Sequence, residues 1–166
     1  MVRPLGSIVM RKCICHLPVL VFLSMSLVAS SFAGDVKGHR VATAHRIAIQ
    51  VDQNDPAVMN LALNNATNVV EYYRAKGEDV DVDIVTYGPG LHMLRVDTSP
   101  VQDRIKHLKD LAFPGKIQFS ACNNTKEGME KKEGHAIAIL PEASVVPSGV
   151  VRLMQLQEQG WSYIRP

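Results

Sequence analysis

The sequence predicts an α/β fold, a three-layer α/β/α sandwich around a mainly parallel five-stranded sheet. Two observations support this prediction. Along residues 46–166, short runs rich in β-branched residues alternate with longer segments whose apolar residues recur every three or four positions. Turn-forming residues separate these segments, and the region contains no internal repeat or linker. Alternating strands and helices are typical of a parallel sheet that helices cover on both faces.

The first part of this region predicts two strands and the helix between them. Residues 46–51 form a β-branched run that ends in a polar turn. The helix that follows is capped by Asp55, has Pro56 in its first turn and ends at Gly77. Residues 81–86 alternate polar and apolar side chains, which predicts a strand with at least one end exposed.

The middle part predicts a helical turn, a second helix and a third strand. Residues 91–94 follow a Tyr-Gly-Pro-Gly break and suit a single helical turn, and residues 100–111 suit a helix. Residues 116–121 read as the third strand. This strand places Cys122 at its carboxyl end.

The segment after Cys122 predicts a short polar helix over residues 124–132. Asn124 and Glu127 have the spacing of a variant capping box at its start. Residues 135–140 fit either a buried helix end or a strand, and both interpretations stay open.

The last part predicts two more strands with a helix between them. Residues 144–146 suit the fourth strand, and Pro-Ser-Gly at 147–149 opens a helix that runs through Gln159. Gly160 then favours the left-handed turn that ends helices. Residues 161–164 suit the closing strand.

Residues 1–33 predict a removable signal peptide. They have a basic start, a mostly apolar stretch at 17–29, and small residues at Ser31 and Ala33, which favour cleavage before Gly34. An uncleaved membrane anchor is the alternative. The candidate span, residues 17–33, contains four Ser and one Pro and is shorter than the roughly 20 residues that cross a bilayer comfortably.

Cleavage would leave 133 of the 166 residues, in the periplasm or secreted, with no membrane contact. We expect a flexible lead-in at 34–45 and one domain at 46–166. The leader carries three basic residues and no acidic one, so the 18 basic residues of the full chain fall to 15 against 16 acidic ones, a net charge of −1. This balance gives no support for a nucleic-acid partner.

Removing the leader also removes Cys13 and Cys15 and leaves Cys122 as the single cysteine. In an oxidising compartment it has no partner within its own chain, so it is either buried and inert, reactive, or paired with another molecule. Its place before a helix start and close to Lys126 would lower the pKa of the thiol. The competing interpretation is that a cysteine at a strand end serves only as a small buried apolar side chain.

His92 is the histidine expected at the same edge of the sheet as Cys122. It would act as a base or anion partner for Cys122 if its loop folds over, and otherwise it is a surface residue. The histidines lack the spacing of a zinc site, and Asp52 with Asp55 resembles a cation site only weakly. No phosphate-binding loop or serine-esterase elbow is present, so we expect neither metal nor cofactor.

Four segments together carry a resemblance to a known family. They are Cys122-Asn123-Asn124-Thr125, Tyr87-Gly88-Pro89-Gly90, residues 146–150 and residues 156–164. From about Arg46 to Pro166 the chain resembles the DsrE/DsrF-like sulfur-relay family.

This resemblance implies a compact α/β sandwich that assembles into trimers or hexamers. It implies that Cys122 accepts sulfane sulfur as a persulfide and passes it on without a metal or organic cofactor. Asn124 and Thr125 match the Cys-x-Asn-Thr pattern of the family, whereas Asn123 stands where that pattern has glycine.

The resulting hypothesis is an exported sulfur carrier, more a carrier than an enzyme in the usual sense, that meets a sulfur-donor or thiol partner protein. An alternative is a non-catalytic small-ligand-binding or scaffold oligomer in which Cys122 is structural. A third is a thiol-redox protein that forms a mixed disulfide, which needs a cysteine from another protein.

Overall fold

The computed structural model describes residues 45–111 and 116–166, which belong to one compact unit. The predicted signal peptide and all of the predicted lead-in except His45 lie outside the described residues. The strands are β1 (His45–Val51), β2 (Val80–Thr86), β3 (Lys116–Cys122), β4 (Ala143–Val146) and β5 (Ser162–Ile164). The helices are α1 (Pro56–Ala75), the 3₁₀ helix η1 (Gly88–Leu94), α2 (Gln102–Leu111), α3 (Asn123–Glu133) and α4 (Gly149–Glu158).

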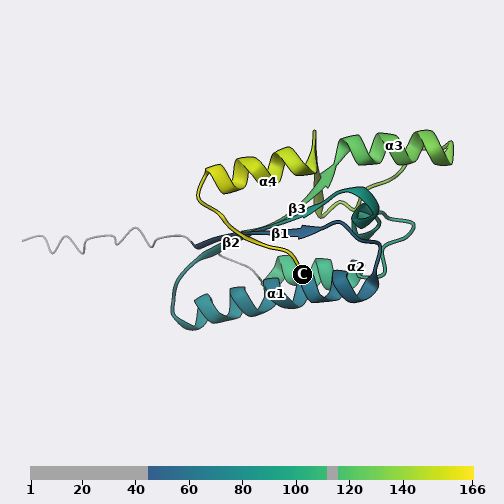
Figure 1. The fold of residues 1–166 in the computed structure, drawn as a ribbon. Coiled ribbons are helices and arrows are strands. Elements are labelled where there is room, and N and C mark those ends of the chain that lie inside the picture. Colours follow the sequence, from purple (N-terminus) through teal and green to yellow (C-terminus); the bar gives the residue numbers. More distant parts are fainter. Residues whose placement is uncertain (1–44, 112–115) are drawn as a thin grey trace, which may run out of the picture. The chain divides into compact units, whose positions relative to one another are not determined.

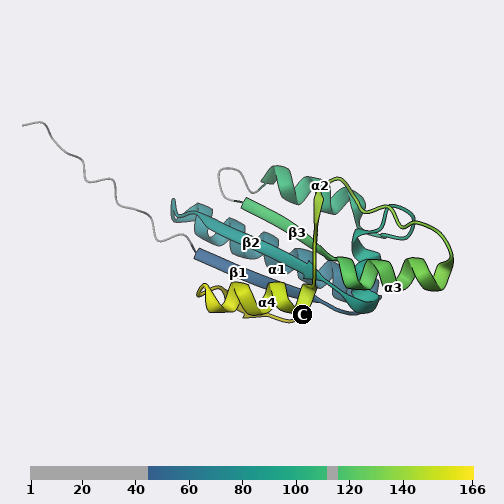
Figure 2. The same ribbon diagram turned by 90° about the horizontal axis from the view of Figure 1, so that it is seen from above.

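The five strands form one parallel sheet in the order β4-β3-β2-β1-β5. Helices α1 and α2 lie on one face and α4 lies on the other (Figure 1). Seen from above, α3 continues past the carboxyl end of β3 (Figure 2). The predicted α/β sandwich with a parallel five-stranded sheet is therefore confirmed.

The two faces of the sheet differ in how much apolar surface they bury. Alternate strand residues such as Ile49, Ile84 and Phe119 point toward α1 and α2 and form the large core. On the opposite face the buried apolar cluster consists of Ala48, Val85, Leu153 and Leu156. Since each large buried side chain contributes roughly 1.5 to 3 kcal/mol, the first face supplies most of the apolar stabilisation.

The predicted helix signals act as expected at α1 and α4. The Asp55 carboxylate accepts a hydrogen bond of 2.7 Å from the amide of Ala57, which is the expected N-cap. Gly77 and Gly160 adopt positive φ angles of 69° and 81° just after these helices end. Glycine reaches this conformation without steric cost, so both helices stop where the sequence indicates.

The start of α3 differs from the prediction. Cys122, not Asn124, is the N-cap residue, and the helix begins at Asn123. The side-chain amide of Asn123 donates to the Glu127 carboxylate at 2.7 Å, so the predicted capping box between Asn124 and Glu127 does not form. The strand and the helix follow one another directly, which places the sulfur atom at the first turn of α3.

Residues 135–140, which fit two interpretations, form neither a helix nor a regular strand. Ile139 makes an isolated antiparallel bridge with Arg95. Arg95 is buried and its guanidinium bonds Glu133 at 2.7 and 2.8 Å and Asp97 at 2.6 and 2.9 Å. The hydrogen bonds that its guanidinium donates to both carboxylates, with Glu133 the larger influence, raise the pKa of Arg95. These bonds tie the end of α3 to the segment after η1.

The alternation of β2 predicts a strand with at least one end exposed, and Asp81 near its start is partly exposed. Asp83 is fully buried, with 0% of its surface exposed, and the strand is covered on both faces. The polar side chain of Asp83 therefore faces the protein interior, where it pairs with residues of other elements, as described below.

Within the described residues, the helices lack the combination of length and apolar character that a membrane span requires.

Candidate functional site

Cys122 lies at the carboxyl end of β3, where it pairs in register with Val146 of β4. Its side chain is enclosed and only 4% exposed. Among the described residues it is the free cysteine. The edge where parallel strands end is the usual place for ligand binding in open α/β sheets, so the sulfur sits where chemistry is expected.

Two helices begin beside this sulfur. Helix α3 starts directly after Cys122, and α4 starts at Gly149, next to the end of β4. A Cβ atom placed on Gly149 would lie 3.3 Å from the Cβ of Cys122 and 2.9 Å from that of Tyr87. The amide of Asn124 donates to the carbonyl of Pro147 at 3.3 Å, which joins the two helix starts. Both positive helix ends therefore face the same atom.

Thr125 adds a hydroxyl donor to this arrangement. Its Oγ1 accepts a hydrogen bond of 2.9 Å from the amide of Gly88, in the turn after β2. A hydroxyl has one proton to donate, and this bond leaves that proton free for Cys122. The turn at Gly88 therefore orients the Thr125 hydroxyl toward the sulfur.

The pKa of the Cys122 thiol is lowered from its ordinary value. Burial is the largest single influence and raises this pKa. The Thr125 hydroxyl and the backbone amides of Gly149, Thr125 and Asn124 act in the opposite direction and together outweigh burial. The Cys122 side chain makes no N-cap hydrogen bond, and these groups act on the sulfur as hydrogen-bond donors that favour its charged form. The site favours a thiolate.

His92 and Lys126 do not join this arrangement. His92 Nδ1 is 2.9 Å from the Thr98 hydroxyl. The Lys126 ammonium is 2.6 Å from a carboxylate oxygen of Glu130, one turn along α3. Neither residue is among the main influences on the pKa of Cys122. Of the predicted site residues, the structure brings together Cys122, Thr125 and the backbone of Asn124.

The sequence interpretation missed the contributions of Gly149, Tyr87 and Gly88. The sequence indicates a helix start at 147–149 and a break after a strand at Gly88. Both segments carry the family resemblance, but their spacing does not connect them with the sulfur. The order of the strands brings the ends of β2, β3 and β4 together, and that order is not visible in the spacing of residues along the chain.

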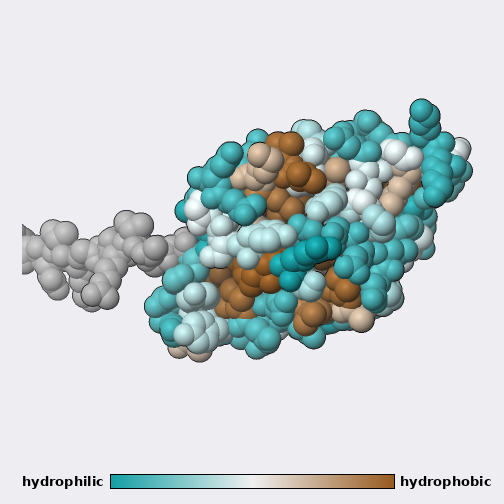
Figure 3. Space-filling view, in the orientation of Figure 1, coloured by the Kyte–Doolittle hydropathy of each residue, from teal (hydrophilic) through white to brown (hydrophobic). Residues whose placement is uncertain are grey.

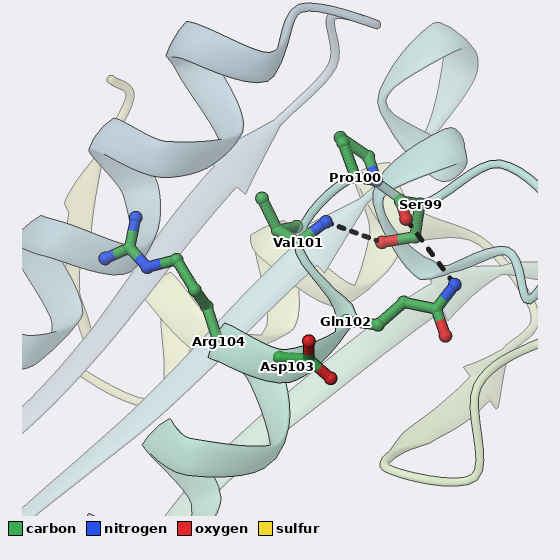
Figure 4. A pocket seen from close by; sticks show the side chains of 6 residues that line it. All are labelled: Ser99, Pro100, Val101, Gln102, Asp103 and Arg104. Carbon is green, nitrogen blue, oxygen red and sulfur yellow. Dashed lines mark hydrogen bonds between the residues drawn. The ribbon is translucent and has the colours of Figure 1, made fainter.

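No group of three or more metal-ligating side chains occurs among residues 45–111 and 116–166. A hollow of about 470 Å³ lies at residues 99–104, at the start of α2 (Figure 4). Gln102 and Val101 bond Ser99 there, and Arg104 points away toward α1 (Figure 4). This hollow holds no cysteine or histidine and belongs to another part of the domain.

Replacing Gly149 by alanine should destabilise the fold. The new methyl group would collide with Tyr87 and crowd Cys122, and such overpacking costs about 1 to 3 kcal/mol. Urea denaturation would measure the loss. Gly128→Ala on α3 is the matched control, because nothing lies within 4 Å of its Cβ and alanine favours helix by up to about 1 kcal/mol. Equal stability of the two variants would contradict the close approach at Gly149.

Replacing Thr125 by valine should raise the pKa of Cys122. Valine has the shape of threonine but no hydroxyl, and loss of a donor to the thiolate favours the neutral thiol. The rate of alkylation by iodoacetamide, followed against pH, should show its midpoint at higher pH than in the wild type. His92→Ala should leave the midpoint in place. If His92→Ala moved the midpoint and Thr125→Val did not, His92 rather than Thr125 would be the residue that acts on the thiol.

Comparison with known proteins adds to this geometry. The model of the DsrE/DsrF-like family matches residues 45–166. No curated protein matches the chain. A solved structure of similar fold is that of MTH1491, a protein of unknown function from Methanobacterium thermoautotrophicum. It is 29% identical with a TM-score of 0.60 over 74% of this chain and 99% of its own. BT1422 of Bacteroides thetaiotaomicron, a conserved protein of unknown function, is 15% identical with a TM-score of 0.46 over 73% and 94% of the two chains.

The family model spans well over half of the chain and includes every described element from β1 to β5. The chain therefore belongs to the DsrE/DsrF-like family.

Proposed function

We propose that this protein is a sulfur carrier that holds sulfane sulfur as a persulfide on Cys122. Membership of the DsrE/DsrF-like family suggests sulfur relay at the level of the family. The observation that carries the proposal for this chain is the placement of the Cys122 sulfur between the first turns of α3 and α4, within reach of the Thr125 hydroxyl. A thiolate is the reactive form of cysteine, and this placement favours it.

The reaction requires no outside oxidant or reductant. The Cys122 thiolate attacks the outer sulfur of a donor persulfide, and a new S–S bond forms while the S–S bond of the donor breaks. The donor leaves as a thiolate, and Cys122 carries one additional sulfur atom. A second thiolate then attacks that outer sulfur, and Cys122 leaves as a thiolate. The terminal sulfur of the persulfide is also anionic, so the same donors stabilise it.

We also propose that the protein is exported, to the periplasm or beyond. The basic start, apolar stretch and small residues of residues 1–33 support this. Export would leave Cys122 without a partner in its own chain, which suits a sulfur that exchanges with other molecules.

A homo-oligomer, a trimer or a hexamer, is the proposed assembly. Three apolar side chains of α4 are about half exposed: Val150, Val151 and Met154. Figure 3 shows apolar surface over α4. Buried contact between copies would remove this surface from water.

Met154→Glu should weaken the assembly, because a charge on that surface would be desolvated in the interface. Light scattering at matched concentration would show a lower mass than for the wild type. Leu61→Glu is the control, since Leu61 is also about half exposed but lies on α1. A monomeric wild type would rule out the assembly.

Intact mass of the mature protein, before and after incubation with polysulfide, tests the carrier. We expect the wild type to gain one sulfur atom that a reductant removes, and Cys122→Ser to gain none. The same spectrum locates the first residue, which we expect to be Gly34. Uptake that is unchanged in Cys122→Ser would end the proposal.

A scaffold with a structural cysteine is the second candidate. The low exposure of Cys122 favours it, because an enclosed thiol meets partners slowly. This candidate predicts that the folded protein resists iodoacetamide and takes up no sulfur, which is the opposite outcome of the same experiment.

A further inference from the structure

Asp83 is an acidic side chain enclosed inside the domain. It lies in the middle of β2, on the face that α4 covers, and none of its side chain is exposed. An enclosed carboxylate is stable only when it is paired and hydrogen-bonded. Its partners therefore show which elements depend on it.

Two residues of other elements satisfy Asp83. The Ser120 hydroxyl of β3 donates to Oδ1 at 2.8 Å. From α4, Nε and Nη2 of Arg152 donate to Oδ2 at 2.9 and 2.7 Å. Burial raises the pKa of Asp83, and the bonds from Ser120 and Arg152 offset part of that effect. The paired donors of Arg152 suit an ionised carboxylate. One buried group thus joins β2, β3 and α4.

The same residues stand next to the candidate site. Ser120 precedes Cys122 by two residues, so both side chains lie on the same face of β3. Arg152 lies in the first turn of α4, three residues after Gly149, whose amide acts on the sulfur. The network therefore connects the strand that carries the sulfur with the helix whose start faces it.

Few other interactions hold α4 in place. Its apolar contact with the sheet is the small cluster of Leu153 and Leu156 with Ala48 and Val85, against which the partly buried Tyr87 and Trp161 also pack. Among the described residues of α4, Arg152 is the one whose side chain bonds the side chain of a strand residue. The position of α4 therefore depends strongly on its ion pair with Asp83.

We propose that the Asp83–Arg152 ion pair, together with Ser120, is a positioning device that holds the first turn of α4 against Cys122 and so sets how readily this thiol ionises. The proposal deepens the proposed sulfur-carrier function, on which its biological use rests. The ionisation of the thiol itself is measured without any sulfur transfer.

Asp83→Asn gives the sharpest test. The main influences on the pKa of Cys122 are a hydroxyl, amides and burial, with no charged side chain among them. If Asp83 acted directly by its charge, removing that charge would favour the thiolate and move the alkylation midpoint to lower pH. Positioning predicts the opposite. We expect the midpoint to move to higher pH, with the thiolate fraction at a fixed pH below it reduced about three- to tenfold.

The experiment uses iodoacetamide with the full mature protein and follows the modified mass against pH. Arg152→Lys keeps the charge but loses the paired donors, so we expect a smaller shift in the same direction. Arg104→Gln, which removes a bond between α1 and α2 on the other face, should leave the midpoint unchanged. Circular dichroism confirms that each variant is folded.

A folded Asp83→Asn variant with the wild-type midpoint, or with a lower one, overturns the proposal. If that variant does not fold, Ser120→Ala and Arg152→Lys decide, and wild-type midpoints in both overturn it. Sulfur uptake is measured separately. If the variant shifts the midpoint but the wild type takes up no polysulfide sulfur, the positioning role holds and the carrier function is refuted. If the wild type takes up sulfur but the midpoint does not shift, the carrier function holds and the positioning role is refuted.

Discussion

The candidate site depends on the contact between the start of α4 and the end of β3. At this contact Gly149 is so close to Tyr87 and Cys122 that no larger residue fits without displacement. The amide of Gly149 then acts on the sulfur together with those of Asn124 and Thr125, which belong to α3. Neither helix alone provides this environment. Because the two helices follow different strands, the parallel sheet that sets β3 and β4 side by side is what brings their first turns together.

The difference between the two faces of the sheet explains how such a site is kept in place. The face toward α1 and α2 contains the large apolar core, and it stabilises the fold without fixing the sulfur. The face toward α4 is polar at its centre, where Asp83, Ser120 and Arg152 meet. Hydrogen bonds have preferred directions, whereas apolar contacts allow sliding, so a polar centre defines the position of α4 more narrowly. Gly88 plays a comparable part for Thr125, since its amide fixes the hydroxyl that faces the thiol.

Much of the fold follows from local patterns in the sequence. The Asp55 cap, the glycines after α1 and α4 and the β-branched runs identify the elements, because these signals depend on neighbours along the chain. Cys122 and Thr125 were also predicted site residues. The role of Asp83 was not predicted, because a strand with a polar exposed face and a strand with a buried ion pair show the same alternation of polar and apolar residues. His92 was expected near the sulfur because its loop lies at the same edge of the sheet, and Lys126 because it follows Cys122 closely in sequence. In the structure their side chains contact Thr98 and Glu130 instead. Which side chains meet across a sheet depends on strand order, which spacing does not encode.

The most direct test of this account is the ionisation of Cys122 itself. The thiolate absorbs in the ultraviolet where the thiol does not, so the difference between wild type and Cys122→Ser can be titrated with pH in the folded protein. The account predicts a midpoint below the value of about 8.5 for a free cysteine. In urea, where the helix starts are lost, the midpoint should return to that value. A midpoint in the folded protein at or above the unfolded value would contradict the claim that the two helix starts and Thr125 favour the thiolate.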